Sequence, residues 1–159
     1  MNPTDYKDPR VFTLYEQHAI STALRAMERA LRQPGSVLDS PTVVTDFLRL
    51  KLGTLPHEVF AILYLNSQNQ LIAFEEAFRG TVNQTSVYPR EVVKSALMHN
   101  AAAVILAHNH PSGTPEPSHA DRMLTDHLRR ALELVDVATL DHVIVAGEKR
   151  YSFAEHGLV

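Results

Sequence analysis

Cysteine is absent from this chain of 159 residues. Its absence excludes disulfide bonds, zinc sites built from thiolates and catalysis by a cysteine nucleophile. Any metal ion that the chain binds must therefore be held by nitrogen and oxygen ligands.

A strong excess of charge of one sign is also absent. The chain has 15 Lys and Arg against 18 Asp and Glu, which gives a net charge of −3, and the two signs are mixed along the sequence. Proteins that bind the phosphate backbone of nucleic acids use clusters of cationic side chains. The composition therefore does not support nucleic-acid binding.

Long apolar runs are missing as well. A helix that spans a bilayer needs about 20 consecutive apolar residues, and no segment approaches that length. The first ten residues, MNPTDYKDPR, are polar and lack the apolar core of a signal peptide. We therefore expect a cytoplasmic protein that makes no membrane contact.

The apolar residues that are present suffice for one globular unit. They make up 45% of the sequence, and the length is that of a single domain. After the polar leader, apolar residues recur at helical spacing until Pro34 and Gly35 interrupt the pattern. We expect residues 1–36 to form a leader and a helix that packs on a domain made by residues 37–159.

The rest of the chain alternates between helical and strand patterns. Pro41 at a first helical position and Gly53 after the last one bracket a second helix. Two apolar runs around the polar turn at residues 67–70 predict a β-hairpin. The further predicted elements are a helix in PREVVKSALMHN, a central strand in AAAVILAH, a long helix after Ser118 with Met123 among its inward positions, and a final strand, turn and strand. This order predicts an α/β (α+β) fold with a mixed central β-sheet flanked by helices.

One segment, HNHPSGTPEPSHAD, indicates a metal site. In a strand alternate side chains share a face, so His108 and His110 point the same way with Cα atoms roughly 6–7 Å apart. A proline-stiffened loop then leads into a helix whose first turn carries Asp121. Two imidazoles and one carboxylate suit Zn²⁺ and leave a fourth position for water.

Each part of this segment also has a purely structural interpretation. His108 and His110 alone are compatible with surface or core histidines, and Ser118 with Asp121 forms an S-x-x-D capping box. The occurrence of both parts at one strand-to-helix junction favours the metal site.

The pattern H-x-H-P, six residues, then S-x-x-D resembles that of the JAMM (MPN-domain) zinc metallohydrolases. The segments VFAILYLNSQNQLI, FRGTVNQTSVYPREVVKSAL, AAAVILAHNHPSG and DHVIV resemble the RadC-like branch of that superfamily. The resemblance covers about residues 40–159 and implies an MPN/JAMM-like fold with a three-layer arrangement like that of cytidine deaminase. It also implies a short form without the N-terminal helix-hairpin-helix region of longer RadC-like proteins.

The resemblance assigns roles to individual residues. It implies that His108, His110 and Asp121 bind Zn²⁺ and that the Ser118 hydroxyl helps to stabilise a tetrahedral intermediate. His142, in the segment DHVIV, is expected to be a packed or hydrogen-bonded strand histidine.

The general base implied by the resemblance is a glutamate at the start of a strand. Glu58, directly before the run VFAILYL, is at the matching place and is the favoured residue. Glu76 is the alternative, with its neighbour Glu75 as a further competitor.

The implied activity is hydrolysis of an amide bond by a peptidase or isopeptidase, with a peptide, protein or conjugate as substrate. A metal-dependent nuclease or DNA-repair-associated protein is an alternative, although such enzymes more often use two metals and additional carboxylates. A non-catalytic binding module is a second alternative. The N-terminal helix is free to pack on its own domain or on a second subunit, so a homodimer is a further possibility.

Overall fold

The secondary structure follows the predicted order of helices and strands. We describe it from a computed structural model in which residues 12–34, 37, 41–80 and 87–159 are placed well enough for description. The leader at residues 1–11 lies outside these ranges. The elements are α1 (Leu14–Leu31), α3 (Pro41–Leu52), β1 (Val59–Leu65), β2 (Leu71–Arg79), α4 (Pro89–Met98), β3 (Ala103–Asn109), α5 (His119–Glu133), β4 (Ala138–Ala146), β5 (Lys149–Ser152) and a 3₁₀ turn, η1 (Ala154–His156).

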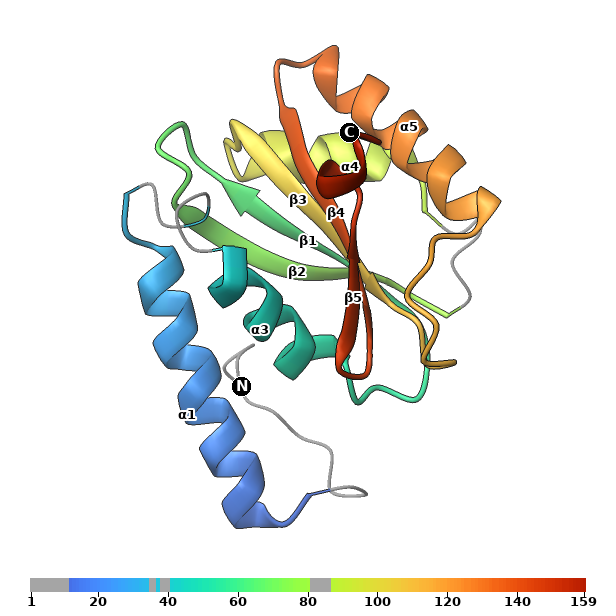
Figure 1. Cartoon of the computed structure of the whole chain (residues 1–159). Helices are drawn as coiled ribbons and strands as arrows, with labels where there is room; N and C mark the ends of the chain where they lie inside the picture. The colour runs from blue at the N-terminus through green and yellow to red at the C-terminus, as the bar shows by residue number, and fades with distance from the viewer. Residues whose placement is uncertain (1–11, 35–36, 38–40, 81–86) are drawn as a thin grey trace.

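A five-stranded mixed sheet in the order β2-β1-β3-β4-β5 forms the middle layer (Figure 1). β1 is antiparallel to both β2 and β3, and β4 is antiparallel to β5. β3 and β4 are parallel. A parallel pair needs a crossover connection, and α5 provides it. The end of β3 is therefore followed directly by the loop that leads into α5.

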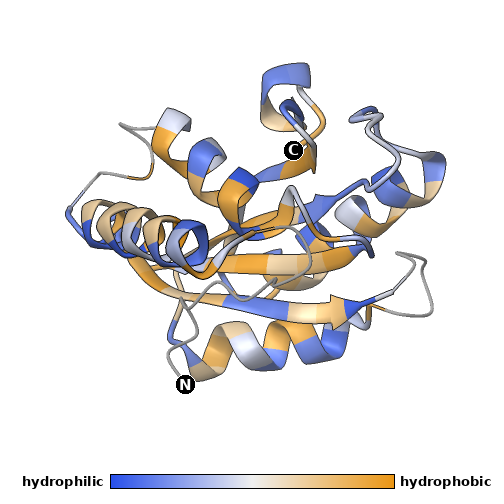
Figure 2. Ribbon diagram, turned by 90° about the horizontal axis from the view of Figure 1, so that it is seen from below, coloured by the Kyte–Doolittle hydropathy of each residue, from blue (hydrophilic) through white to orange (hydrophobic). Residues whose placement is uncertain are grey.

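Both faces of the sheet are covered by helices. Alternate residues of β1 enter different cores: Ala61 and Leu63 join the cluster that contains α1 and α3 residues, whereas Phe60 and Ile62 join the cluster with α4 and α5. Figure 2 shows the apolar colour concentrated along the strands and on the adjoining sides of the helices. The three-layer fold with a mixed sheet, predicted from the sequence, is confirmed.

The helix after Ser118 differs from its prediction in one detail. The periodicity places Met123 on the inner face, but the residue is 37% exposed. The inner face of α5 carries Leu124 and Leu128, as the periodicity predicts, together with the polar residues Asp121 and Thr125. The polar residues lie inside because they take part in a hydrogen-bonded cluster.

The helix at the N-terminus packs on the rest of the fold. Leu24 and Leu31 of α1 are fully buried in the same core as α3. Beyond the helix, the Arg32 guanidinium donates to the carbonyl oxygens of Leu71 at 3.2 Å and Ile72 at 2.9 Å. These contacts tie the end of α1 to the hairpin. The domain boundary between residues 36 and 37 stays a prediction. No helix within the described ranges is long and apolar enough to cross a bilayer.

Candidate metal centre

Strand β3 places His108 and Asn109 on opposite faces of the sheet. His108 is opposite Phe60 in the register with β1, so it lies on the α5 side, and it is fully buried. Asn109 points to the other side, where its Oδ1 accepts from the Val59 N–H at 2.7 Å and its Nδ2 donates to the His57 carbonyl at 2.9 Å. The residue between the two histidines therefore ties the end of β3 to the start of β1.

Asp121 acts as a helix-capping residue and also faces the histidines. The Ser118 hydroxyl accepts from the Asp121 N–H at 3.1 Å, and the Ser118 N–H donates to Asp121 Oδ2 at 2.7 Å. These two bonds form the predicted capping box and start α5. They also hold the carboxylate in one orientation, toward the end of β3.

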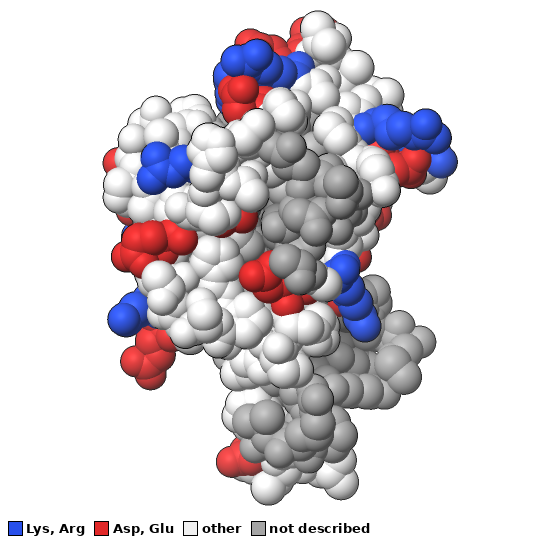
Figure 3. Space-filling view, turned by 90° about the vertical axis from the view of Figure 1, so that its right-hand side faces the viewer, with Lys and Arg blue, Asp and Glu red and all other residues white. Residues whose placement is uncertain are grey.

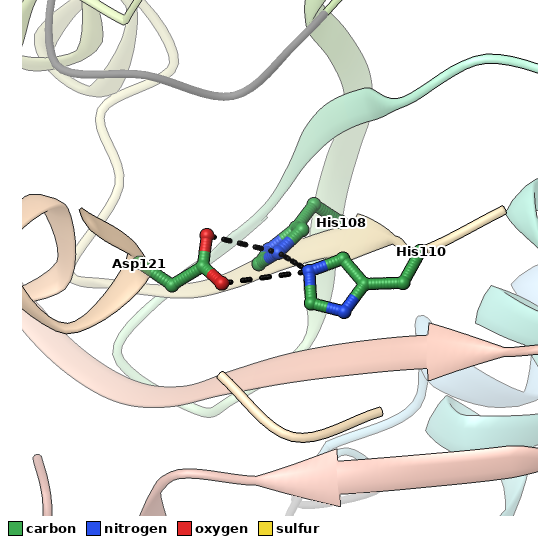
Figure 4. Close-up of side chains that lie close together, drawn as sticks. All are labelled: His108, His110 and Asp121. Carbon is green, nitrogen blue, oxygen red and sulfur yellow. Dashed lines mark hydrogen bonds and ion pairs between the residues drawn. The ribbon is translucent and has the colours of Figure 1, made fainter. Parts of the chain in front are cut away.

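The three predicted ligands converge at this junction (Figure 4). The His108 Nε2 atom lies 3.3 Å from Asp121 Oδ1, and the His110 Nε2 atom lies 3.4 Å from Asp121 Oδ2. The two Nε2 atoms are 2.9 Å apart. One ligand atom from each residue lies within 4.8 Å of the others. This cluster can therefore hold a metal ion.

The donor atoms of the cluster fit a cation. His110 Nδ1 lies 2.7 Å from the Thr114 carbonyl oxygen. A carbonyl oxygen only accepts, so the proton of a neutral ring is on Nδ1 and the lone pair of Nε2 faces the cluster. Nitrogen and carboxylate oxygen donors without thiolate are a set that zinc accepts.

Electrostatics keep two of the three ligands in the form that binds a metal. Burial lowers the pKa of His108 despite its contact with Asp121. Burial alone raises the pKa of Asp121, but its contacts with the His108 and His110 rings outweigh burial and lower that pKa. The hydrogen bond with Asp121 raises the pKa of His110. Near neutral pH the cluster therefore contains a neutral His108 and an ionised Asp121, as metal binding requires.

Behind His108 lies a second buried histidine. His142 Nε2 is 2.7 Å from His108 Nδ1, and His142 Nδ1 is 2.6 Å from the Thr125 hydroxyl. The His142 ring stacks on Phe153 with the ring centroids 4.7 Å apart. Burial lowers the pKa of His142 well below its ordinary value. The prediction of a packed, hydrogen-bonded strand histidine is confirmed. Thr125 was not singled out from the sequence, although it follows Asp121 by four residues and so lies on the same face of α5.

Glu58 lies close enough to the cluster to influence its charge. Its carbonyl accepts from the Gly80 N–H at 2.9 Å, which extends the β1–β2 pairing by one residue. Glu58 precedes Phe60 by two residues, and Phe60 is opposite His108. Burial dominates the pKa of His108 and the Asp121 hydrogen bond dominates that of His110, but the negative charge of Glu58 favours the protonated form of both.

The competing glutamates lie elsewhere. Glu76 is in register with Ala61, which faces the α1 and α3 layer, and its carboxylate pairs with Arg79 at 3.5 Å. Glu75 accepts from the Ser95 hydroxyl at 2.7 Å and lies 2.5 Å from His99 Nε2. The assignment of the base to Glu58 stays a prediction, and its charge acts on both cluster histidines whereas Glu75 and Glu76 contact residues outside the cluster.

Charges of both signs are scattered on the face shown in Figure 3. The blue groups are separate and lie close to red ones. No continuous basic surface appears among the described residues of this face. This distribution agrees with the small net charge of the sequence.

The layered sheet and the cluster define a class of protein, the JAB/MPN-type domain with a His-His-Asp group able to bind a metal. A family model described as the RadC-like JAB domain matches residues 38–158. The chain belongs to this RadC-like family.

Curated relatives fall into two lengths. The chain is 54% identical over 151 residues to the UPF0758 protein YkfG of Escherichia coli K12, and the match covers 95% of this chain and 96% of YkfG. It is 58% identical over 143 residues to a UPF0758 protein of Leptothrix cholodnii, with 90% of this chain and 64% of the relative covered. It is 59% identical over 140 residues to the UPF0758 protein Mpe_A2695 of Methylibium petroleiphilum, with 88% of this chain and 63% of the relative covered. The chain thus spans nearly all of YkfG and less than two thirds of the other two.

Proposed function

We propose that the chain is a zinc-dependent hydrolase of amide bonds, a peptidase or isopeptidase acting on a peptide, protein or conjugate. The observation that carries the proposal is the convergence of two imidazole nitrogens and a capped carboxylate where β3 leads into α5. Family membership supports a hydrolase, because the JAMM pattern and the RadC-like match fall on the same residues.

A bound zinc ion would supply part of the chemistry, and residues of the chain supply the rest. When bound, Zn²⁺ supplies a Lewis acid that polarises a carbonyl oxygen and lowers the pKa of a water to about 7. Glu58, whose charge acts on both cluster histidines, takes a proton from the attacking water. The Ser118 hydroxyl oxygen already accepts from the Asp121 N–H, so its own proton is available to an oxyanion on the substrate.

The alternatives have less support. A two-metal nuclease needs a second group of ligands, and the described residues contain one group of three or more potential ligands with this geometry. A binding module without chemistry does not require the Asp121 carboxylate to face both histidines, as it does here. Zinc as the metal, the substrate class and a homodimer stay proposals.

The test combines metal content with hydrolysis. We expect one zinc per chain, and cleavage of members of a panel of fluorogenic peptides and lysine-linked isopeptides. His108→Ala should lose both zinc and cleavage, because a two-ligand site binds zinc weakly. His127→Ala is the matched control, since His127 is an exposed histidine of α5, and it should retain both.

Two results would contradict the proposal. Stoichiometric zinc in His108→Ala would place the metal at other residues. A zinc-loaded protein that cleaves no member of the panel would argue against the amide hydrolase and leave the metal site intact.

A further inference from the structure

We propose that Thr125 and His142 are positioning residues that hold His108 as the tautomer protonated on Nδ1. The lone pair of His108 Nε2 then points at the metal site. The inference rests on the metal site of the proposed function, but it concerns residues behind that site and can be tested without catalysis.

A continuous hydrogen-bond chain connects two of the ligands through these residues. It starts at the backbone carbonyl of Asp121, which accepts from the Thr125 hydroxyl at 2.7 Å. Thr125 Oγ1 lies 2.6 Å from His142 Nδ1, and His142 Nε2 lies 2.7 Å from His108 Nδ1. All four side chains are at most 2% exposed. The chain thus links α5 to β4 and β4 to β3 within the interior.

Only two arrangements of protons satisfy both contacts of the His142 ring when the rings are neutral, as burial favours. In the first, Thr125 donates to Asp121, His142 Nδ1 donates to Thr125, and His108 Nδ1 donates to His142 Nε2. In the second, the two bonds of the His142 ring are reversed, so that Thr125 donates to His142 Nδ1 and His142 Nε2 donates to His108 Nδ1. The first leaves a lone pair on His108 Nε2, whereas the second leaves a proton there, which would exclude a metal ion.

The Asp121 carbonyl selects the first arrangement, because its 2.7 Å contact with Thr125 is much shorter than the 3.3 Å contact of Asp121 Oδ1 with His108 Nε2, which acts to favour a proton on Nε2. A hydroxyl has one proton, and a carbonyl oxygen can only accept. In the second arrangement the Thr125 proton would point to His142, and two oxygen atoms 2.7 Å apart would face each other without a proton between them. Because Asp121 is itself a predicted ligand, the backbone of one ligand fixes the tautomer of another.

Packing keeps His142 in the place that this chain requires. Its ring stacks on that of Phe153. The Phe60 ring meets the His142 ring edge-on, with the two ring centroids 5.6 Å apart. His110, in contrast, needs no such chain, because the Thr114 carbonyl contacts its Nδ1 directly. The two histidine ligands therefore reach the same tautomer by different routes.

Thr125→Val tests the chain because it removes the hydroxyl and keeps the shape. We expect ¹⁵N NMR of the metal-free protein at about pH 8, where neutral imidazoles predominate, to show His108 protonated on Nδ1 in the wild type and a mixture of tautomers in Thr125→Val. Zinc affinity, measured by competition with a chromophoric chelator, should fall by about 10–100-fold. Thr125→Ser keeps the hydroxyl and should restore both readouts.

Thr45→Val is the matched control. Thr45 is a buried threonine of α3 whose hydroxyl donates to the carbonyl four residues earlier, Pro41, at 3.1 Å. It lies in the opposite helical layer, so its substitution should change neither the His108 tautomer nor the zinc affinity.

The outcomes separate this inference from the proposed function. Unchanged zinc affinity and tautomer in a folded Thr125→Val protein would overturn the positioning role. If Thr125→Val does not fold, His142→Phe, which keeps a ring between Phe60 and Phe153, should show the same loss of affinity, and normal affinity there would likewise overturn it. A wild type that binds no zinc but shows the Nδ1 tautomer, lost in Thr125→Val, would refute the proposed zinc enzyme and leave the hydrogen-bond chain supported.

Discussion

Glu58 and Glu76 differ in the groups that surround them. Glu58 precedes the first residue of β1 and influences the charge of both cluster histidines. Glu76 shares its face with Ala61, on the side of α1 and α3, and pairs with Arg79. The two glutamates thus have different surroundings, and the assignment of the general base to Glu58 stays a prediction.

Glu58→Gln should retain zinc and lose amide hydrolysis by about 10²–10⁴-fold, since the amide cannot accept the proton of water. Glu76→Gln should leave both unchanged. The measurement is kcat/KM on a cleaved panel substrate together with zinc content. A reversed pattern, with activity lost in Glu76→Gln alone, would assign the base to the other glutamate.

Among the secondary-structure elements, helix α4 is held to the edge strand β2 by contacts of the Glu75 side chain. Ser95 and His99, one helical turn apart, both contact its carboxylate. Burial acts to raise the pKa of Glu75, but the hydrogen bonds from His99 and Ser95 outweigh it and lower that pKa. The ionised carboxylate is therefore the form that stabilises the docked helix.

Glu75→Gln should lower the free energy of unfolding at pH 7 by about 1 kcal/mol, a modest amount because the carboxylate is partly exposed. The folded-state pKa is depressed, so the stabilisation is complete above the unfolded pKa of about 4.3 and disappears as the pH falls through the lower folded value. Urea unfolding of the wild type and of Glu75→Gln, between pH 7 and the lowest pH at which the protein stays folded, measures how the difference in stability shrinks. Glu76→Gln should stay within about 0.5 kcal/mol of the wild type. A difference that grows toward acid pH would contradict the assignment.

For the whole molecule, the cluster joins two layers of the fold. His108 comes from the central sheet and Asp121 from the first turn of the covering helix α5. A metal bound to both adds its binding free energy to the stability of the folded state, because the ligands are not held together in the unfolded chain.

Removal of zinc by a chelator should therefore lower the Tm. At a free zinc concentration of 100 times the Kd the contribution is about 2.7 kcal/mol, which for this chain length corresponds to roughly 5–10 °C. Differential scanning calorimetry with and without chelator measures the shift. Asp121→Ala should show no such dependence, and an equal shift in that variant would point to a metal bound elsewhere.

Local sequence was sufficient for much of the architecture and for the three residues of the cluster that could hold a metal ion. Alternation along AAAVILAHNH separates His108 from Asn109 in any extended strand, and the capping pattern from Ser118 to Asp121 operates within one helical turn. These features depend on neighbours a few residues away. Their geometry therefore follows from local periodicity.

Contacts between distant segments required the folded structure. The face on which Glu76 lies depends on an irregular register between β1 and β2, and the contact of Thr125 with His142 depends on how α5 docks on β4. Likewise the sequence does not reveal the partners of Glu75, because Ser95 and His99 follow it by 20 and 24 residues, in and directly after helix α4. Strand register and helix docking are set by the packing of many side chains at once, so no local pattern specifies them.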